Sequence, residues 1–485
     1  MLAHVTTFAI DGLASRRITV EVDLRRGLPA FTIVGRGDAA VRESRERVHA
    51  ALLNCGFDFP QRRITVNLAP AHLRKVGPGF DLATACGVLG ASEQLPAAAL
   101  DGWAVFGELS LSGELRHCRG VLAVAEGARR MGLERVLCPT ESAAEAALAG
   151  ILPVAFRHLA DTVAYLRGEL EPDPLPPPRA HALEAAQPDL ADVRGQERAR
   201  RALELAAAGR HNLLLAGPPG TGKTMLARRL PGILPPLGRE AALEVTRIHS
   251  VAGLLPPDEP LLQRPPFRAP HHSASTAAIV GGGAGIRPGE ASLAHQGVLL
   301  LDELAEFARP ALEGLRQPLE DGVVSIARAA GRAIFPARFQ LVATMNLCPC
   351  GARGDPAAQC SCSPQRLAAY RDKLSRALLD RFDLVVAMPR PRALELAAGP
   401  SEASAPVAAR VASAHEKLDG PVLRRSPDAD DLLSRAVERL PLSGRGRARV
   451  ARVGRTIAAL AAAERVEAEH VAEALAYRSP QELAA

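Results

Sequence analysis

Residues 217–224 read Gly-Pro-Pro-Gly-Thr-Gly-Lys-Thr, and Lys223 in this stretch is one of only four lysines among the chain's 59 lysines and arginines. The apolar run HNLLLAG (211–217) is typical of a buried strand and leads into the stretch, and TMLARRLPGIL (224–234) follows it with helical spacing. A strand, a glycine-rich loop and a helix in this order place backbone N–H groups around phosphates. The stretch therefore predicts a phosphate-binding loop.

The residue types of this loop suit ATP. The slim ammonium of Lys223 can reach around the β- and γ-phosphates, where a planar guanidinium fits poorly. The hydroxyl of Thr224 is expected to bind Mg²⁺. The backbone of the other loop residues is expected to cradle the phosphates: Gly217, Pro218, Pro219, Gly220, Thr221 and Gly222. We therefore expect the chain to bind and hydrolyse ATP, with ATP and Mg²⁺ as cofactors.

Two further apolar runs end in polar side chains. In GVLLLDELAEF (297–307), three leucines lead directly to Asp302, which is suited to holding Mg²⁺, and to Glu303, which is suited to polarising the attacking water as a general base. FQLVATMN (339–346) ends in Asn346, which could orient that water. An asparagine at a strand end is by itself usually a turn residue, so its functional interpretation depends on its neighbours.

One arginine is a candidate for acting on a second subunit. Arg381 lies between two acids in LLDRFD (378–383). Taken by itself, this arginine would be interpreted as a member of a surface ion pair. In a ring-shaped ATPase such an arginine reaches the ATP of the neighbouring subunit and stabilises transition-state charge. We therefore assign Arg381 to catalysis.

The pattern along the chain indicates several domains. Alternating strands at 18–24 and 64–68, with helical spacing at 41–55 and Gly56 as a C-cap, predict a mixed domain over residues 1–168. The proline-rich stretch within 169–188 predicts a semi-rigid linker. The strand–loop–helix block is assigned to 189–392, and helical spacing predicts an all-helical domain over 393–485.

Composition narrows the class of protein. A chain of 485 residues with 47% hydrophobic residues suits about three domains with packed cores. No run of 18 apolar residues and no charged leader before an apolar stretch is visible, so we expect no membrane partner and a cytoplasmic location. The net charge of +6 is compatible with a polyanionic partner but does not establish one.

Four of the eight cysteines are clustered within fifteen residues in a loop rich in glycine, proline and aspartate: Cys348, Cys350, Cys360 and Cys362. Four soft thiolates suit a tetrahedral Zn²⁺, and a closed set of four predicts a structural role. The alternatives are four free thiols or reversible disulfides, because the common C-x₂-C spacing is absent. The scattered cysteines at 55, 86, 118 and 138 are expected to be small buried side chains.

Long ordered motifs carry a family resemblance. They include DVRGQERARRALELAAAGRHNLLLAGPPGTGKT (192–224), RIHSVAG (247–253), FRAPHHSAS (267–275), SLAHQGVLLLDELAEF (292–307), LRQPLEDG (315–322), MNLCPCG (345–351) and LLDRFDL (378–384), with GLPAFTIVGRGDAAVRESRERVHAAL (27–52) and RRITVNLAPAHLRKVGPGFDL (62–82) towards the N-terminus. Together they resemble the ComM/YifB group of magnesium-chelatase-like AAA+ ATPases over nearly the whole chain.

The resemblance implies an α/β fold: an AAA+ P-loop NTPase core with a helical lid, preceded by an α+β domain similar to ribosomal S5 domain 2 and Lon protease. It implies a helix-2 insertion and a hairpin at 323–335 with Arg328 and Arg332 near its tip. Arg445, in the SGR motif at 443–445, is implied as a sensor-2 arginine that contacts ATP. The group is taken to form a homohexameric, DNA-dependent motor, and its ComM members drive branch migration of recombination intermediates during natural transformation.

Departures from the family pattern leave alternatives open. Arg376-Ala377 stands where a Gly-Pro pair is more common, which makes Arg376 a weaker competitor to Arg381. KVGPGFDL (75–82) has no serine beside its lysine, so a Lon-type Ser-Lys peptidase is not expected. His271 and His272 are interpreted as packing or hydrogen-bonding residues of the insertion. A chelatase-type motor subunit, an ATP-dependent peptidase-like protein and a nucleotide-switched adaptor remain as other classes.

Overall fold

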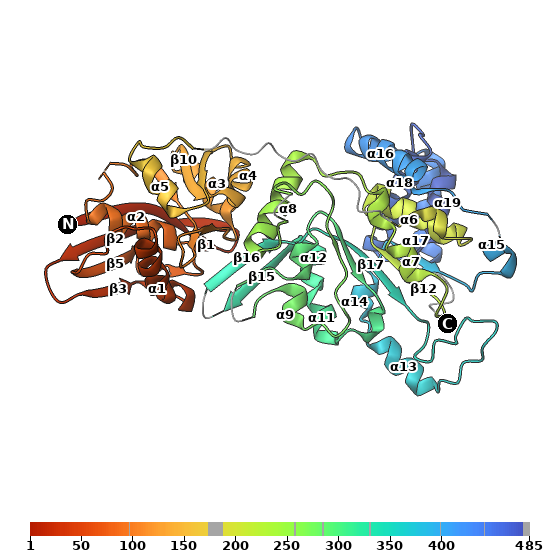
Figure 1. Cartoon of the computed structure of the whole chain (residues 1–485). Coiled ribbons are helices and arrows are strands. Elements are labelled where there is room, and N and C mark those ends of the chain that lie inside the picture. Colours follow the sequence, from red (N-terminus) through yellow and green to blue (C-terminus); the bar gives the residue numbers. More distant parts are fainter. Residues whose placement is uncertain are drawn as a thin grey trace. The chain divides into compact units, whose positions relative to one another are not determined.

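The computed structural model describes residues 1–96, 98–172, 188–256, 259–283, 286–328, 331–397, 399–440 and 442–478. The chain forms two compact units, each built from segments that are not contiguous in sequence (Figure 1). The first unit contains Met1–His181, Arg239–Leu262 and Ala327–Phe335, and the second contains Ala182–Gly238, Gln263–Ile326 and Pro336–Ala485. The domain boundaries expected from sequence stay predictions, and residues 173–187 of the expected linker lie outside the described residues.

A four-stranded sheet with the order β1-β2-β5-β3 forms one layer of the first unit. Its strands are β1 (Leu2–Asp11), β2 (Ala14–Arg25), β3 (Ala30–Val34) and β5 (Arg63–Ala69). β1 and β2 are antiparallel, as are β2 and β5, while β3 runs parallel to β5. Every second side chain of β2 is buried, from Ile18 to Leu24, which is the pattern of a sheet with one covered face.

Two helices share the core of this sheet. They are α1 (Ala39–Asn54) and α2 (Asp81–Ala91), whose buried side chains join those of the strands in one hydrophobic cluster. A buried ion pair links the two helices: Arg47 donates from Nε and Nη2 to the two carboxylate oxygens of Asp81 at 2.6 and 3.0 Å. Asp81 is fully buried, so Arg47 is the charge that makes its burial tolerable.

The first unit also contains a parallel sheet with the order β11-β10-β7. Its strands are β7 (Trp103–Val105), β10 (Arg135–Pro139) and β11 (Leu152–Phe156), accompanied by α3 (Val121–Arg130), α4 (Ala143–Ala147) and α5 (Leu159–Leu166). Smaller elements are β4 (Arg36–Gly37), β6 (Arg74–Lys75), β8 (Glu108–Leu109), β9 (Leu115–Arg116) and η1 (Thr140–Ser142).

Helix α8 (Arg239–Ala252) belongs to the first unit although it lies far along the sequence from the other helices there. Arg247 donates to both carboxylate oxygens of Glu126 on α3, at 2.8 and 2.5 Å. The hydroxyl of Ser250 donates to the buried carboxylate of Glu145, which also accepts from the Leu122 N–H. These charged and buried polar contacts fix α8 against α3 and α4.

A five-stranded parallel sheet forms the centre of the second unit, with the order β13-β14-β17-β12-β18. Its strands are β12 (Leu213–Ala216), β13 (Phe267–Arg268), β14 (Val298–Leu301), β17 (Gln340–Met345) and β18 (Leu384–Ala387). β12, β14 and β17 are buried along their whole length, as expected for a parallel sheet covered on both faces.

Helices cover this sheet and extend its core. Two precede β12: η2 (Leu190–Asp192) and α6 (Glu197–Gly209). Those between the strands are α7 (Lys223–Ala227), η3 (Leu230–Ile233), α9 (Thr276–Val280), α10 (Glu290–Leu293), η4 (Leu304–Glu306), α11 (Arg309–Gly314), α12 (Arg316–Asp321), α13 (Pro364–Asp372) and α14 (Arg376–Leu379). The C-terminal helices are α15 (Ala393–Ala397), α16 (Ser404–Asp419), α17 (Pro427–Arg439), α18 (Gly444–Leu460) and α19 (Ala468–Ala476). Side chains of α16 to α19 join those of α6 and β12 in one hydrophobic cluster.

Several expectations about local structure are confirmed. The strands expected at 18–24 and 64–68 lie within β2 and β5, and the helix expected at 41–55 is α1, followed by Gly56 with φ +78°. The hairpin expected at 323–335 is formed by β15 (Val323–Arg328) and β16 (Gly331–Pro336), in which Arg332 is exposed. Residues 329 and 330 and the side chain of Arg328 lie outside the described part. Within the described residues, no helix combines the length and apolar character needed to cross a membrane.

We expect Arg47→Met to destabilise the first unit by about 3–5 kcal/mol, because it leaves the carboxylate of Asp81 buried without its cation. The matched control is Arg45→Met on the same helix. Arg45 pairs with Glu46 at the exposed surface, so its loss should cost less than about 1 kcal/mol. Urea unfolding followed by the fluorescence of Trp103, the chain's one tryptophan, measures this unit. Equal losses for the two variants would contradict the importance of the buried pair.

Candidate active site

The loop at 217–224 connects the end of β12 to the start of α7, and its glycines meet specific steric demands. Gly220 and Gly222 have φ values of +77° and +88°, a left-handed backbone that glycine adopts without strain. Gly217 approaches the end of β18 so closely that a Cβ there would lie 2.2 Å from the carbonyl oxygen of Met388. The glycine spacing of the motif therefore follows from the backbone path of this turn.

Lys223 is buried within the loop that it follows. Its ammonium donates to the carbonyl oxygens of Gly217 and Pro218 at 2.8 and 2.7 Å and to Oδ1 of Asn346 at 3.2 Å. Burial lowers the pKa of Lys223, and the charges of Asp302 and Glu303 act in the opposite direction. An ammonium held among neutral oxygens in a partly desolvated pocket is well suited to receive an anionic phosphate.

Asp302 is the centre of a second hydrogen-bond group at the same edge of the sheet. Its Oδ1 accepts from the hydroxyls of Thr224 at 2.7 Å and Thr344 at 2.5 Å. The hydroxyl oxygen of Thr344 in turn accepts from the Glu303 N–H at 3.0 Å. A carboxylate and a hydroxyl adjacent to a phosphate-binding loop are the oxygen ligands that Mg²⁺ uses at nucleotide sites, so Thr224 and Asp302 fit the ion expected from sequence.

Glu303 stands at a specialised backbone position. Its φ of +57° is left-handed for a residue with a side chain, which costs about 1 kcal/mol or more and is common at functional sites. The side chain is 57% exposed, so its carboxylate can meet water, and His272 Nδ1 lies 3.9 Å from its Oε2. The rings of His271 and His272 are 4.1 Å apart. The sequence led us to expect packing or hydrogen bonding for this pair, and His271 does hydrogen-bond Ser273, but the proximity of His272 to Glu303 was not predicted.

Arg381 lies at the opposite edge of the sheet. Its carbonyl oxygen accepts from Asn212 Nδ2 at 2.9 Å, and Asn212 precedes the first residue of β12. The four residues of β12 lie between Asn212 and Gly217, so the two are five steps of about 3.3 Å apart along an extended chain, roughly 16 Å. The structure therefore does not bring Arg381 to the phosphate-binding loop of its own chain.

Arg445 lies with Arg381 and not with Lys223. Both arginines pair with Glu320, Arg445 through Nη1 at 3.5 Å. Arg381 is largely buried, and that burial lowers its pKa, as do the nearby charges of Arg445 and Arg316. Arg316 pairs with Glu313, so Arg381 and Arg445 are the two guanidinium groups on Glu320, and they leave excess positive charge that a phosphate can neutralise. Arg376, the competing candidate, is exposed in the first turn of α14.

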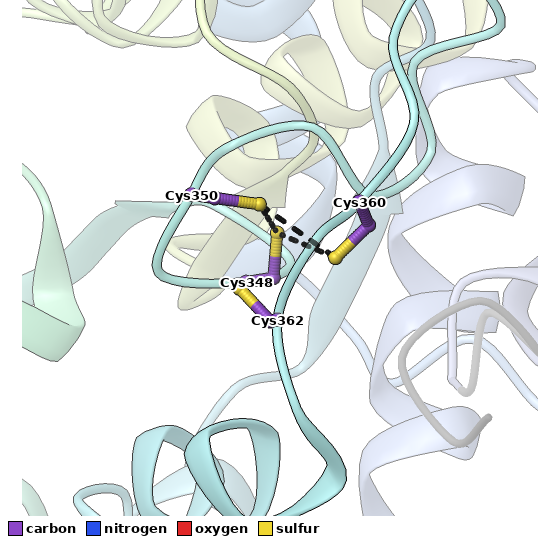
Figure 2. Close-up of side chains that lie close together, drawn as sticks. All are labelled: Cys348, Cys350, Cys360 and Cys362. Carbon is purple, nitrogen blue, oxygen red and sulfur yellow. Dashed lines mark hydrogen bonds between the residues drawn. The ribbon is translucent and has the colours of Figure 1, made fainter.

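The four clustered cysteines converge in the fold (Figure 2). All four Sγ atoms lie within 4.8 Å of one another, and those of Cys348, Cys350 and Cys360 are 3.3 to 3.7 Å apart. A tetrahedral zinc with bonds of about 2.3 Å needs sulfur atoms about 3.8 Å apart, so the donor set fits that ion. Hydrogen bonds to Cys350 lower its pKa to about 6 and favour its thiolate, and the largest effect comes from the backbone of Ala352.

In the described part of the N-terminal unit, Lys75 is not paired with a nucleophile of the kind that a Ser-Lys peptidase uses. Lys75 is fully buried, and its ammonium donates to the Pro70 carbonyl oxygen at 2.5 Å. Burial lowers the pKa of Lys75. Among the described residues, no hydroxyl or thiol forms a hydrogen bond with this ammonium. Burial also raises the pKa of the Cys118 thiol, which disfavours the nucleophilic thiolate there. A lysine without a nucleophile cannot perform acyl transfer.

Comparisons with known proteins cover nearly the whole chain. The profile of the family described as magnesium chelatase, subunit ChlI, matches residues 189–396. Two related profiles, subunit ChlI of Mg-chelatase and the ChlI C-terminal region, match residues 20–142 and 401–478. The three matched segments include the phosphate-binding loop, the cysteine cluster and the C-terminal helices.

Several full-length relatives are similar to the chain. An uncharacterised protein of Mycobacterium tuberculosis is 46% identical, with 98% of both chains covered. The uncharacterised protein YifB of Salmonella typhimurium is 43% identical and the competence protein ComM of Haemophilus influenzae is 42% identical, each with 99% of this chain and 97% of the relative covered. Because these alignments cover nearly the whole of each chain, the similarity includes every domain of this protein.

We expect His272→Ala to lower the rate of ATP turnover by about 10- to 100-fold while changing ATP affinity less than about twofold, because it removes a neighbour that restrains Glu303. His271→Ala is the matched control, since the His271 ring accepts from or donates to Ser273 and makes no ion pair with Glu303 in the described structure. Steady-state ATPase and equilibrium nucleotide binding separate the two quantities. A weaker Kd with an unchanged kcat for His272→Ala would refute a positioning role.

Proposed function

Because the chain belongs to the ComM/YifB family of magnesium-chelatase-like proteins, we propose that it is an ATP-hydrolysing motor that remodels DNA. The observation that carries the proposal is the convergence of Lys223, Thr224, Asp302 and Asn346 at one edge of a parallel sheet. These residues come from the ends of three neighbouring strands, and they supply a cation, Mg²⁺ ligands and a polar group near the phosphates.

In the proposed hydrolysis, Lys223 binds the β- and γ-phosphates and Asn346 orients the attacking water. Mg²⁺, held by Thr224 and Asp302, supplies neutralisation of phosphate charge when bound. The exposed carboxylate of Glu303 accepts a proton from the water as the water oxygen attacks the γ-phosphorus, and the bond from that phosphorus to the β–γ bridging oxygen breaks to release ADP. The backbone N–H groups that follow the two prolines, from Gly220 to Thr224, cradle the phosphates, because Pro218 and Pro219 have no N–H to donate.

The arginines at the far edge favour a site shared between subunits. Arg381 and Arg445 lie together beside Glu320 and, in one chain, away from Lys223. If copies assemble head to tail, the amino edge of one sheet faces the carboxyl edge of the next, and both arginines can meet the γ-phosphate of the neighbour. This arrangement favours a closed ring, for which the family resemblance implies six copies, with the C-terminal helices acting as the lid of each ATPase core.

DNA is the partner that the charge and the relatives favour. One relative is named a competence protein, and the present chain has a net charge of +6. The hairpin of β15 and β16 carries the exposed Arg332, which can grip a phosphate backbone without reading sequence. We propose branch migration of recombination intermediates in natural transformation, acting on branched or single-stranded DNA in the cytoplasm.

Three further assignments complete the proposal. The N-terminal unit is a scaffold or a platform for DNA or a partner, similar to the Lon protease domain but without its peptidase activity, since among the described residues the ammonium of Lys75 donates to a backbone carbonyl and to no nucleophile. The cysteine cluster holds a structural Zn²⁺. A chelatase-type motor subunit is the second candidate, favoured by the name of the matching profile, and recovery of a porphyrin-binding subunit with the purified chain would support it.

The direct test of the function is the ATPase activity of the metal-replete chain with single-stranded, duplex and four-way-junction DNA. We expect DNA to stimulate turnover at low salt, and the stimulation to fall steeply as salt rises because phosphate contacts release counterions. Glu303→Gln should bind ATP and lower turnover by about 100-fold or more. Turnover unaffected by any DNA would refute a DNA motor, and full turnover by Glu303→Gln would refute the assigned base.

A mixing experiment tests the shared site. Lys223→Ala and Arg381→Ala should each abolish most turnover, the first on its own side of the interface and the second on the neighbour's. Mixed rings contain some interfaces that join an intact loop to an intact arginine, so the mixture should regain activity that neither variant has alone. The matched control mixes Arg376→Ala with Lys223→Ala, because Arg376 is the competing candidate for the arginine that acts on the neighbour. A mixture as inactive as its two components would show that Arg381 acts within its own chain or not at all.

A further inference from the structure

The loop that carries the cysteine cluster, residues 347–363 (the cysteine loop), lies directly on the phosphate-binding loop. Gly351 has φ +80°, and a Cβ there would lie 2.7 Å from Cγ of Pro219. Gly354 also has a left-handed backbone, with φ +79°, and a Cβ there would lie 4.0 Å from Cγ of Pro218. The backbone of the cysteine loop is therefore packed against the two prolines of the GPPGTGKT motif.

The cysteine loop is also continuous with Asn346. Cys348 follows Asn346 by two residues and is fully buried. The carbonyl oxygen of Asn346 accepts from the hydroxyl of Tyr370 on α13 at 3.2 Å, and its Oδ1 accepts from Lys223. The start of the loop is thus fixed at the phosphate-binding site, and its end leads into α13.

The loop has little regular structure of its own. No helix or strand occurs among residues 347–363, all of which the structure describes. A few turn hydrogen bonds, such as that from the Gly351 N–H to the Cys348 carbonyl oxygen, and an ion pair of Asp355 with Arg390 at 3.3 Å hold it. The point at which its two arms meet is the cluster of four sulfur atoms, two from each arm (Figure 2).

We propose that zinc bound by Cys348, Cys350, Cys360 and Cys362 is a brace for the phosphate-binding loop. The ion ties the two arms of the cysteine loop together, and the closed loop presses Gly351 against Pro219 and holds the strand end that carries Asn346. Metal occupancy then sets how well ordered residues 217–222 are before nucleotide arrives. An effect of this order on ATP affinity rests on the proposed function. The ordering of residues 217–222 by the bound zinc does not.

The test compares the full-length chain with and without its metal, in the absence of nucleotide. Zinc content is measured on protein purified without chelators, and cobalt substitution reports four thiolates through the charge-transfer and d–d bands of a tetrahedral site. Amide hydrogen exchange of the peptide that contains residues 217–222 reports the order of the phosphate-binding loop. We expect one zinc per chain, and exchange in that peptide at least about tenfold faster once the metal is removed.

Two variants separate the brace from simple folding. Cys360→Ser should lose zinc and show the faster exchange, while Cys55→Ser, in the N-terminal unit and outside the cluster, should match the wild type. Gly351→Ala keeps all four ligands but forces a methyl group against Pro219, so it should retain zinc and still show faster exchange at 217–222. Ala358→Ser, exposed in the same loop, is its control. Slow exchange of the buried strand β14 in the same experiment verifies that the second unit, which contains the cysteine loop, stays folded.

The outcomes are distinct. A chain that carries no zinc, or a metal-free chain whose residues 217–222 exchange as in the metal-bound chain, overturns the inference. So does a zinc-loaded Gly351→Ala variant with unchanged exchange at those residues. If the brace is found but the metal-replete chain does not hydrolyse ATP or ignores DNA, the proposed function fails and the inference stands.

Discussion

The parallel pairing of β12, β14 and β17 is the constraint on which the whole candidate site depends. It brings Thr224 to Asp302, 78 positions apart, and Lys223 to Asn346, 123 positions apart, at one edge of the sheet. All three strands are buried along their length, so a shift in register would force the side chains on both faces to repack. A slip of one residue would turn buried side chains to the other face and separate the polar ends of the strands, so core packing and site geometry are stabilised by the same contacts.

The two edges of this sheet carry different halves of the proposed chemistry. The carboxyl edge holds Lys223 and Asp302, and the amino edge holds Arg381 and Arg445 beside Glu320. In a single copy, Arg381 and Arg445 therefore lie at the other end of the strands from the loop that we propose to bind a triphosphate. That separation is the physical basis for proposing that a neighbouring copy supplies these two arginines.

Local features of the site could be predicted from the sequence, and features made by tertiary contact could not. The phosphate-binding loop, the acid pair and the cysteine cluster each lie within a short stretch, and the residue types and spacing in that stretch are enough to predict the chemistry. The proximity of His272 to Glu303 and of Arg445 to Arg381 joins segments 31 or more positions apart, with no spacing to reveal it. The packing of Gly351 against Pro219 likewise appears only once the strands are placed side by side.

The same contrast holds for the fold. Alternation in β2 and helical spacing in α1 were sufficient to predict both elements, because each has one face in a core. The association of α8 with the N-terminal helices was not visible, since it depends on a buried carboxylate, Glu145, that accepts from Ser250 more than a hundred positions away. Charged residues paired in a core have no periodicity that distinguishes them from surface residues.

The most direct measurement of the central claim is a cryo-electron microscopy structure of the assembled chain with Mg²⁺ and a non-hydrolysable ATP analogue. The account predicts the β- and γ-phosphates within hydrogen-bond distance of Lys223, the ion between Thr224 and Asp302, and Arg381 of a neighbouring copy at the γ-phosphate. An analogue bound elsewhere, or a loop at 217–224 that stays empty at saturating analogue, would contradict it.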